Sequence, residues 1–516
     1  MLDQLNSRFS LLCIVVSALL MGGVTLAYPR TLLDSPTSTY VGKTILEGGV
    51  PYRDALEPRA PGVFFAYALQ IFLLGESAVA LRTFDLLWQL ATALVLASIA
   101  AHLCNRPTAG LIAGVAYLLA YFTEHYSSWA QPDTFLSLPL ALAFLFSIRG
   151  VRRDSLSDWL VAGLMVGIAT LFKPPYGLFG VLPLLLILSQ LRGAARRAGL
   201  KLFVLAIGFA VPLAATALYF LWKNGFEDLL SAQFVLAPAY LSRIHEMLGI
   251  PAFINSLLRP VLIPFFFMTA VGFVSLAVRL HTEKPHWIEN MAVAWFAIAG
   301  ATFILHGSYL RYHYLAMAAP AAILFASSLA RMLDSPAQWR RPFANLLIAL
   351  MLIVPAAKWQ HNARFAWQVW RGFAPDAPWR ELGKYIKAHT NLDDTIFVWG
   401  NAPLVYLLAE RKAASRFLCT AYISVDAPTL NYREIALREL HQRRPTYFVL
   451  VKEGSITPAL PDSQTSLAEF PALRAWVGSG YQVEIENHLY ALFRRKAPES
   501  SVPAKRLPAH GADRTN

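Results

Sequence analysis

Charged side chains are scarce in this sequence of 516 residues, where Asp, Glu, Lys and Arg make up 15% of the chain. Soluble domains carry about 25%, so the scarcity argues against a soluble enzyme. Cysteine is scarcer still: Cys13, Cys104 and Cys419 show neither metal-binding nor CxxC spacing. We therefore expect no cysteine metal site, and we expect no disulfide because two of the three cysteines fall in or beside predicted membrane helices. Proline and glycine occur at ordinary frequency, which excludes a collagen-like or disordered chain.

Long apolar runs take the place of the missing charge, since 56% of the residues are hydrophobic and the mean hydropathy is +0.45. Runs of about 17 to 25 apolar residues are long enough to cross a bilayer as helices. They predict an α-helical polytopic membrane protein of about eleven spans, near residues 11–28, 79–103, 108–123, 133–148, 157–172, 175–191, 202–222, 260–278, 287–305, 314–330 and 343–357. The first run ends in small residues near Ala27, so a cleaved signal peptide is the alternative there.

Basic residues fall in alternate loops between these runs. With a cytoplasmic N-terminus, the short loops on that side carry Arg106, Arg149, Arg152, Arg153, Arg192, Arg196, Arg197, Lys201, Arg279, Lys284, Arg331, Arg340 and Arg341. This bias follows the positive-inside rule. The net charge of +13 therefore reflects basic residues that orient the protein in the membrane, and we expect no nucleic-acid partner.

The composition changes after the last apolar run. We divide the chain into a membrane module at residues 1–358 with its first outer loop at 29–78, a connector at 359–379, a domain at 380–496 and a disordered tail at 497–516. Residues 395–400 and 447–452 are predicted to be buried strands, and residues 403–410 a helix. Alternating strands and helices predict a small α/β domain outside the membrane.

The first outer loop is rich in candidate functional residues. Asp34 opens the segment that ends at Gly42, and Asp54, Glu57 and Arg59 follow within the next 20 positions. The apolar stretch 63–74 is too short to cross and suits a helix at the membrane interface. The alternative interpretation is that Asp34 caps a helix starting near Pro36 and that the other three form a solvated charge cluster.

Further candidates lie at span ends on the same predicted side. Asp133 begins the fourth span, Lys173 ends the fifth, and Arg311 and His313 precede the tenth. Cations at the outer edge of a bilayer suit a lipid phosphate. Helix capping by Asp133 and interface anchoring by the cations are the alternatives.

The order of these motifs resembles the GT-C superfamily of membrane glycosyltransferases. Within it, the sequence is similar to the branch of protein mannosyltransferases and lipid A aminoarabinose transferases, the glycosyltransferase family 39/83 type. The segments that carry the resemblance are 34–42, 48–54, 57–62, the loop ending at Asp133, Lys173-Pro174, 311–314, and the outer segments 396–406 and 414–417.

The resemblance implies an inverting enzyme of the bacterial inner membrane, with its C-terminal domain in the periplasm. It would transfer a sugar from a polyprenyl phosphate to a lipid, glycan or protein acceptor. Asp34 matches the catalytic base and Asp133 a second catalytic acid, although Ser35 stands where the family usually has Glu. Lys173, Arg311 and His313 match positions that hold the donor phosphate, with Asp54, Glu57 and Arg59 as a secondary cluster. A divalent cation is the one cofactor left open, with no metal ligands assigned.

Two other functions stay open: a transporter or flippase of a lipid-linked sugar, and a catalytically inactive assembly subunit whose lost acidic pair is marked by Ser35. Transporters tend to have ionisable residues at mid-bilayer, whereas those in this chain are predicted at the outer edge. We also expect no span to carry a polar stripe, which argues against a channel.

Overall fold

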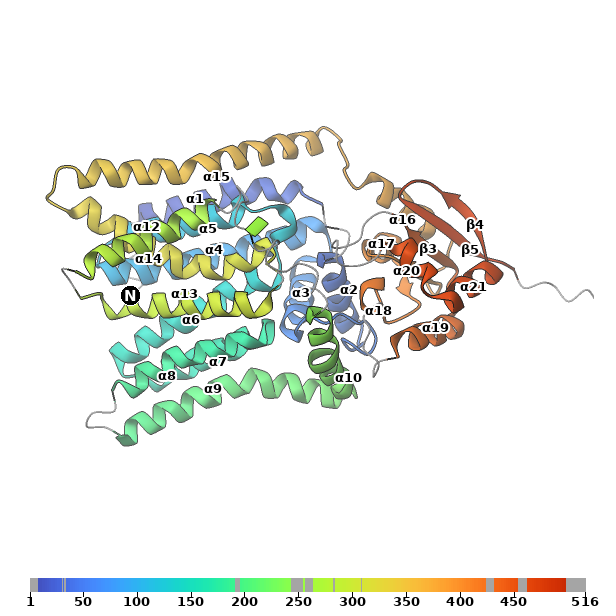
Figure 1. The fold of residues 1–516 in the computed structure, drawn as a ribbon, viewed down its shortest axis with the longest axis horizontal. Helices are drawn as coiled ribbons and strands as arrows, with labels where there is room; N and C mark the ends of the chain where they lie inside the picture. The colour runs from blue at the N-terminus through green and yellow to red at the C-terminus, as the bar shows by residue number, and fades with distance from the viewer. Residues whose placement is uncertain are drawn as a thin grey trace, which may run out of the picture.

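The computed structural model describes residues 8–29, 31, 34–190, 195–242, 254–255, 263–281, 284–307, 309–423, 431–452 and 462–497. A bundle of long helices forms one part of the molecule, and a small domain containing a sheet forms the other (Figure 1). The predicted disordered tail lies outside the described residues, apart from Ala497.

The bundle follows the predicted apolar runs. Its helices are α1 (Arg8–Gly23), α4 (Ala78–Cys104), α5 (Pro107–Thr123), α6 (Pro132–Arg153), α7 (Leu156–Phe172), α8 (Val181–Leu188), α9 (Ala195–Trp222), α12 (Ile263–Arg279), α13 (Trp287–His306), α14 (Leu315–Asp334) and α15 (Arg340–Trp370). Seven helices in the described part of the chain are long and apolar enough to cross a membrane, and several others are shorter. The polytopic helical fold is confirmed, and the number of crossings stays a prediction.

Local sequence signals set the helix ends. Pro107 and Pro132 occupy the first turns of α5 and α6, where the missing N–H has no helical partner to lose. The Ser77 side chain accepts a hydrogen bond from Ala80 N at the start of α4. At the other end of α4, Asn105 adopts a left-handed conformation with φ 53°. Asparagine tolerates this conformation better than most residues.

Two helices of the first outer loop lie at one end of the bundle: α2 (Asp34–Leu46) and α3 (Pro61–Leu74). As predicted, α3 is too short to cross, and its Phe72 and Leu73 are 75% and 57% exposed. α2 packs closely on α3 at Gly42, where a Cβ atom would lie 2.8 Å from Ala68 N. Only glycine allows this approach without a shift of the helices.

The C-terminal domain contains a five-stranded sheet of order β2-β1-β3-β5-β4. The strands are β1 (Thr395–Trp399), β2 (Lys412–Ala413), β3 (Tyr447–Val451), β4 (Tyr481–Glu486) and β5 (Tyr490–Arg495). β1 runs parallel to β2 and β3, and β5 runs antiparallel to β3 and β4. The helices are α16 (Ala377–Ala388), α17 (Leu404–Ala409), α18 (Thr420–Ile423), α19 (Tyr432–Arg443), α20 (Ser463–Ala468) and α21 (Pro471–Gly480). The predicted α/β character is confirmed.

The C-terminal domain is hydrogen-bonded to the first outer loop. Leu56 N donates to Arg416 O at 2.7 Å, and Ala413 N donates to the hydroxyl of Tyr40 in α2 at 2.8 Å. Arg416 also forms an ion pair of 3.3 Å with Asp228 of α10 (Phe226–Ser231). The two parts of the molecule therefore meet through hydrogen bonds and an ion pair, and one of the hydrogen bonds lies directly beside Glu57.

The turns that carry the basic residues lie at the opposite end of the bundle from α2, α3 and the C-terminal domain (Figure 1). Two pairs join these turns there, Arg106 with Asp334 at 2.6 Å and Lys201 with Asp154 at 2.6 Å. The fold thus separates a basic end from the end that carries the candidate residues.

Candidate active site

A cavity of about 500 Å³ opens where the first outer loop, the bundle and the C-terminal domain meet. Five residues singled out in the sequence line it: Asp34, Arg59, Asp133, Lys173 and His313. Hydrophobic and aromatic side chains complete the wall, among them Phe172, Leu305, Leu310, Tyr240, Tyr312 and Tyr422. Tyr422 belongs to α18, so the C-terminal domain contributes to this cavity.

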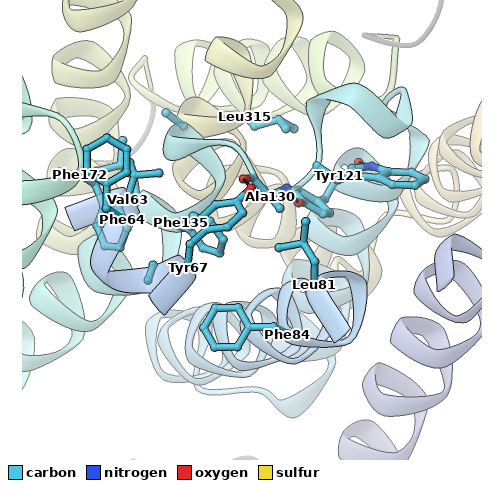
Figure 2. Packing of buried hydrophobic residues seen from close by; sticks show 14 of the residues in the cluster. Val63, Phe64, Tyr67, Leu81, Phe84, Tyr121, Ala130, Phe135, Phe172 and Leu315 are labelled. Atoms are coloured by element: carbon cyan, nitrogen blue, oxygen red, sulfur yellow. Dashed lines mark hydrogen bonds between the residues drawn. The ribbon is translucent and has the colours of Figure 1, made fainter. Parts of the chain in front are cut away.

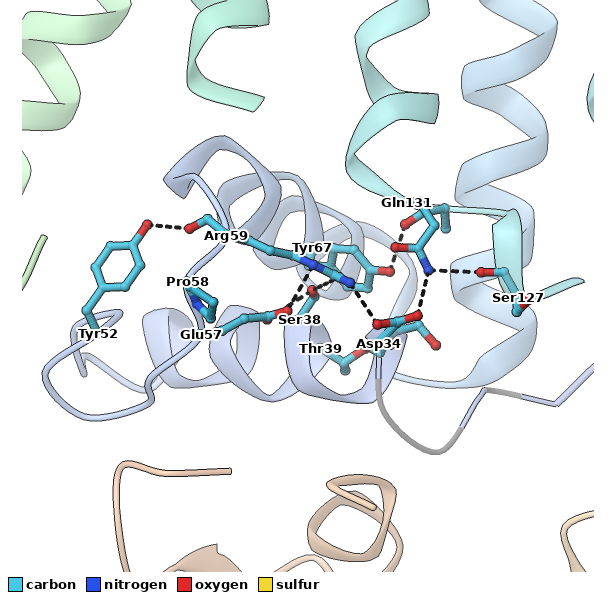
Figure 3. A network of polar contacts seen from close by, with 12 residues as sticks. Asp34, Ser38, Thr39, Tyr52, Glu57, Pro58, Arg59, Tyr67, Ser127 and Gln131 are labelled. Carbon is cyan, nitrogen blue, oxygen red and sulfur yellow. Dashed lines mark hydrogen bonds and ion pairs between the residues drawn. The ribbon is translucent and has the colours of Figure 1, made fainter. Parts of the chain in front are cut away.

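Arg59 is the centre of the first charged cluster (Figure 3). Its Nη2 lies 2.8 Å from Asp34 Oδ1, and its Nε lies 3.1 Å from Glu57 Oε1. The remaining Nη1 donates to Ser38 Oγ at 3.1 Å, and Ser38 Oγ donates to Glu57 Oε2 at 3.2 Å. One guanidinium therefore serves two carboxylates, of which only Asp34 lines the cavity.

Glu57 lies behind Arg59 with 1% of its surface exposed. Burial raises the pKa of Glu57 from 4.5 to about 7; the neighbouring Arg59 opposes this rise and Asp34 adds to it. Glu57 thus changes charge near neutral pH. When it is protonated, the charge of Arg59 is balanced by Asp34 alone.

Asp133 and Lys173 form the second charged cluster. Lys173 Nζ lies 2.7 Å from Asp133 Oδ1, and His313 Nε2 lies 3.8 Å from Asp133 Oδ2. Asp133 occupies the first turn of α6, where the helix dipole favours a carboxylate, and Lys173 directly follows α7. At the start of α3, a Cβ atom on Gly62 would lie 2.7 Å from Leu171 O, so glycine brings the first outer loop against the end of α7.

Gln131 connects the second outer loop to the first cluster. Its Nε2 donates to Asp34 Oδ2 at 3.3 Å and to Ser127 O at 2.9 Å (Figure 3). Asp34 therefore accepts hydrogen bonds from both Arg59 and Gln131, and 33% of its side-chain surface stays exposed. Sequence reasoning missed Gln131 and Ser38, although both lie in segments that it had singled out.

Aromatic packing supports the site from within the bundle (Figure 2). Phe135 of α6 stacks on Phe172 of α7 with ring centroids 5.9 Å apart, and it meets Tyr67 of α3 edge-on at 6.2 Å. Phe135 and Phe172 each lie within two residues of a charged member of the second cluster. The packing thereby fixes the separation between Asp133 and Lys173.

One predicted residue stands apart from this arrangement, and the side chain of another is not described. Asp54 is absent from the cavity lining and pairs with Arg53 at 2.8 Å, while accepting from Val50 N at 2.7 Å. Arg311 begins the 3₁₀ turn η7 (Arg311–Tyr314), and its side chain lies outside the described parts of the chain. The roles assigned to all eight residues stay predictions.

A divalent cation finds no ready ligand set among the described residues. No group of three or more His, Cys, Asp or Glu side chains is arranged there to hold a metal ion. The carboxylates at or near the cavity already form ion pairs, Asp34 and Glu57 with Arg59 and Asp133 with Lys173. We therefore assign no step of the chemistry to a metal.

Comparison with known proteins identifies the fold. The crystal structure of ArnT from Cupriavidus metallidurans bound to undecaprenyl phosphate superposes with a TM-score of 0.58 at 14% identity, covering 95% of this chain and 98% of that chain. The chain has the GT-C fold. The GT-C resemblance inferred from the motifs is thus confirmed at the level of the fold.

Two further comparisons agree with the GT-C fold. Residues 58–219 match the sequence profile of the family described as dolichyl-phosphate-mannose-protein mannosyltransferase. The Archaeoglobus fulgidus oligosaccharyltransferase, crystallised with Zn and sulfate, superposes with a TM-score of 0.51 at 14% identity, covering 86% of this chain and 68% of that chain. No curated protein sequence matches the chain.

Proposed function

We propose that the protein is an inverting glycosyltransferase that uses a polyprenyl-phosphate-linked sugar as donor. The observation that carries this proposal is that one cavity is lined by a partly exposed carboxylate, Asp34, and by two cationic side chains, Arg59 and Lys173. This is the set of groups that such a transfer needs: a proton acceptor and cations for a phosphate leaving group. A GT-C fold around the cavity supports the same class of reaction.

Asp34 would act as the general base in this reaction. The acceptor hydroxyl attacks the anomeric carbon from the face opposite the phosphate, and its proton passes to Asp34. The bond between the anomeric carbon and the phosphate oxygen breaks, and its electron pair leaves with the polyprenyl phosphate. Lys173 and Arg59 would stabilise the charge on that phosphate and His313 would donate a hydrogen bond to it, with Arg311 as the further cation proposed from the sequence. Attack from the opposite face inverts the anomeric centre.

A lipid donor suits the surroundings of the cavity. The apolar lining contributed by Phe172, Leu305 and Leu310 can accept the first part of a polyprenyl chain while the phosphate stays at the charged end. The structurally similar ArnT was crystallised with undecaprenyl phosphate. We propose that transfer takes place on the periplasmic face of a bacterial inner membrane, because the basic turns lie at the other end of the bundle.

A turnover assay distinguishes this proposal from the two alternatives. Purified protein in liposomes is given undecaprenyl phosphate carrying a radiolabelled pentose or, separately, a hexose, with a membrane extract as acceptor source. A transferase moves the label off the lipid and releases undecaprenyl phosphate, a flippase moves the intact donor across the bilayer, and an inactive subunit does neither. We expect label transfer by the wild type and none by Asp34→Asn. Intact donor movement, or no reaction by the wild type with either sugar, would overturn the proposal.

A further inference from the structure

The second outer loop, residues 124–132, and the first turn of α6 present two side chains to the candidate site. Gln131 donates to Asp34, and Asp133, just beyond the loop, pairs with Lys173. Between them and the rest of the loop lies Ala130, whose φ of 59° is in the left-handed region. A residue with a Cβ atom holds this conformation only where its surroundings enforce it.

Two tyrosine hydroxyls bind both sides of Ala130. Ala130 N donates to the hydroxyl of Tyr121 at 3.2 Å, and the hydroxyl of Tyr67 donates to Ala130 O at 3.0 Å. Tyr121 belongs to α5 and Tyr67 to α3, and Figure 2 shows both rings around Ala130. The loop is therefore clamped between the bundle and the first outer loop, one residue before Gln131.

Asp85 of α4 orients the Tyr121 side of this clamp. The Tyr121 hydroxyl lies 2.8 Å from both Asp85 carboxylate oxygens, so it donates to Asp85 while accepting from Ala130 N. Gln89 Nε2 donates to Asp85 Oδ1 at 3.0 Å and contacts Thr134 O at 3.4 Å. Asp85, Gln89 and Tyr121 are each at most 2% exposed.

These residues correct one expectation drawn from the sequence, that no span carries a polar stripe. α4 does carry a buried polar stripe, made by Arg82, Asp85, Gln89 and Thr92. The spacing of three and four residues places them on one face of the helix. The stripe meets the second outer loop: Asp85 contacts it through Tyr121, and Arg82 lies 5.4 Å from the Trp129 ring centroid. We interpret the stripe as a support for the second outer loop.

We propose that Asp85 and Tyr121 are positioning residues for the transfer reaction, which set the placement of Gln131 and Asp133 relative to Asp34. The inference rests on the proposed function, because it concerns the geometry of that site. Tyr121 and Tyr67 fix the two peptide groups on either side of Ala130, from which Gln131 and the start of α6 extend. A displacement of about 1 Å in catalytic groups can cost about 100-fold in rate, so the loop need not unfold for activity to fall.

Tyr121→Phe tests the inference, because it keeps the ring and removes only the hydroxyl. We expect kcat to fall about 10- to 100-fold with the donor KM within about threefold of wild type. The matched control is Tyr117→Phe, one helical turn earlier in α5. Tyr117 is also fully buried and its hydroxyl donates to Gln89 Oε1 at 2.6 Å, but it forms no hydrogen bond with the loop residues 124–132, all of which the structure describes. Both variants should unfold at a lower temperature than the wild type, and only Tyr121→Phe should have a lower kcat.

Hydrogen exchange supplies a readout that does not depend on activity. In Tyr121→Phe, the amides of residues 124–131 should exchange faster than in Tyr117→Phe or the wild type. Tyr67→Phe removes the other half of the clamp, and serves where Tyr121→Phe fails to fold. The Tyr67 and Tyr121 substitutions each remove one hydrogen bond from the same residue, Ala130, so their effects on kcat should be non-additive.

Equal kcat values in Tyr121→Phe and Tyr117→Phe would overturn the inference while leaving the proposed transferase intact. Unchanged exchange of residues 124–131 would overturn it even in a protein that transfers no sugar. A wild type that exchanges as expected but does not cleave the donor would instead refute the proposed function.

Discussion

Asp34 is the residue on which the proposed chemistry depends most. Asp34→Asn keeps the size of the side chain and one acceptor oxygen for Arg59, but it cannot take a proton. We expect transfer to fall by about 100- to 10,000-fold, the usual contribution of general base catalysis, with little change in donor affinity. Single-turnover transfer and donor binding, measured on the same purified protein, check this.

Asp54 offers a matched control for that substitution. It is a carboxylate of the same loop, but it pairs with Arg53 and does not line the cavity. Asp54→Asn should therefore keep near-normal transfer. The reverse pattern, activity in Asp34→Asn and none in Asp54→Asn, would place the base further along the loop.

Glu57 should make stability depend on pH. Its pKa is raised from 4.5 to about 7 on folding, so between these values the folded protein binds more protons than the unfolded chain. Folding stability then falls as pH rises through this window, by about 3 kcal/mol for a shift of this size. Relative to Glu57→Gln, the wild type should lose thermal stability from pH 4.5 to about 7 and change little above about pH 8. A difference in unfolding temperature that is constant over this range would contradict the burial argument.

The candidate residue types could be predicted from the sequence, but their pairing could not. The sequence placed Lys173 beside a lipid phosphate, and the structure also pairs it with Asp133, 40 positions away. It placed Arg59 in a solvated or secondary cluster, whereas the guanidinium lines the cavity and bridges Glu57 and Asp34. Such contacts depend on how α3, α6 and α7 pack, and no local pattern encodes this.

At the scale of helices, the contact between α2 and α3 should decide where Asp34 lies. In Gly42→Ala, the new Cβ would lie 2.8 Å from Ala68 N and 3.0 Å from Tyr67 C, both backbone atoms that cannot move alone. We expect a loss of about 1 to 3 kcal/mol in stability and reduced transfer, because α2 begins at Asp34. Unfolding temperature and transfer rate measure the two effects.

Gly199→Ala is the control for this substitution. Gly199 lies in α9, and a Cβ atom there would meet nothing within 4 Å. Because alanine favours helix over glycine by up to about 1 kcal/mol, this variant should be neutral or slightly stabilised. Similar losses in both variants would show that the packing of α2 on α3 is not the cause.

The elements themselves were largely predictable, since apolar length alone identifies a membrane helix. The short helix α3 and the strands β1 and β3 also coincide with predicted segments. The polar stripe of α4 was overlooked because Arg82, Asp85 and Gln89 interrupt an apolar run too sparsely to lower its hydropathy. Their periodicity was visible, but their common partner, the second outer loop, was not.

For the whole molecule, the orientation in the membrane is the first prediction to test. Single cysteines replace Leu392 in the C-terminal domain, 77% exposed, and Trp339 at the basic end, 63% exposed. In intact cells, an impermeant maleimide should label Leu392→Cys, and it should reach Trp339→Cys only after permeabilisation. The opposite pattern would put the cavity on the cytoplasmic side.

The C-terminal domain and the bundle act together in this account. Tyr422 of α18 lines the cavity, and the hydrogen bond from Leu56 N to Arg416 O joins the C-terminal domain to the first outer loop. The acceptor would therefore approach a cavity whose charged groups come from the membrane module and whose outer wall includes the C-terminal domain.

A structure of the protein with a bound undecaprenyl-phosphate sugar, determined by electron cryomicroscopy in a lipid nanodisc, tests the central claim most directly. We predict that the phosphate lies between Lys173 and Arg59 and that the anomeric carbon faces the cavity space beside Asp34. The lipid chain should run along the apolar wall near Leu305 and Leu310. A phosphate bound at the basic end of the bundle, or a sugar directed away from Asp34, would contradict the account.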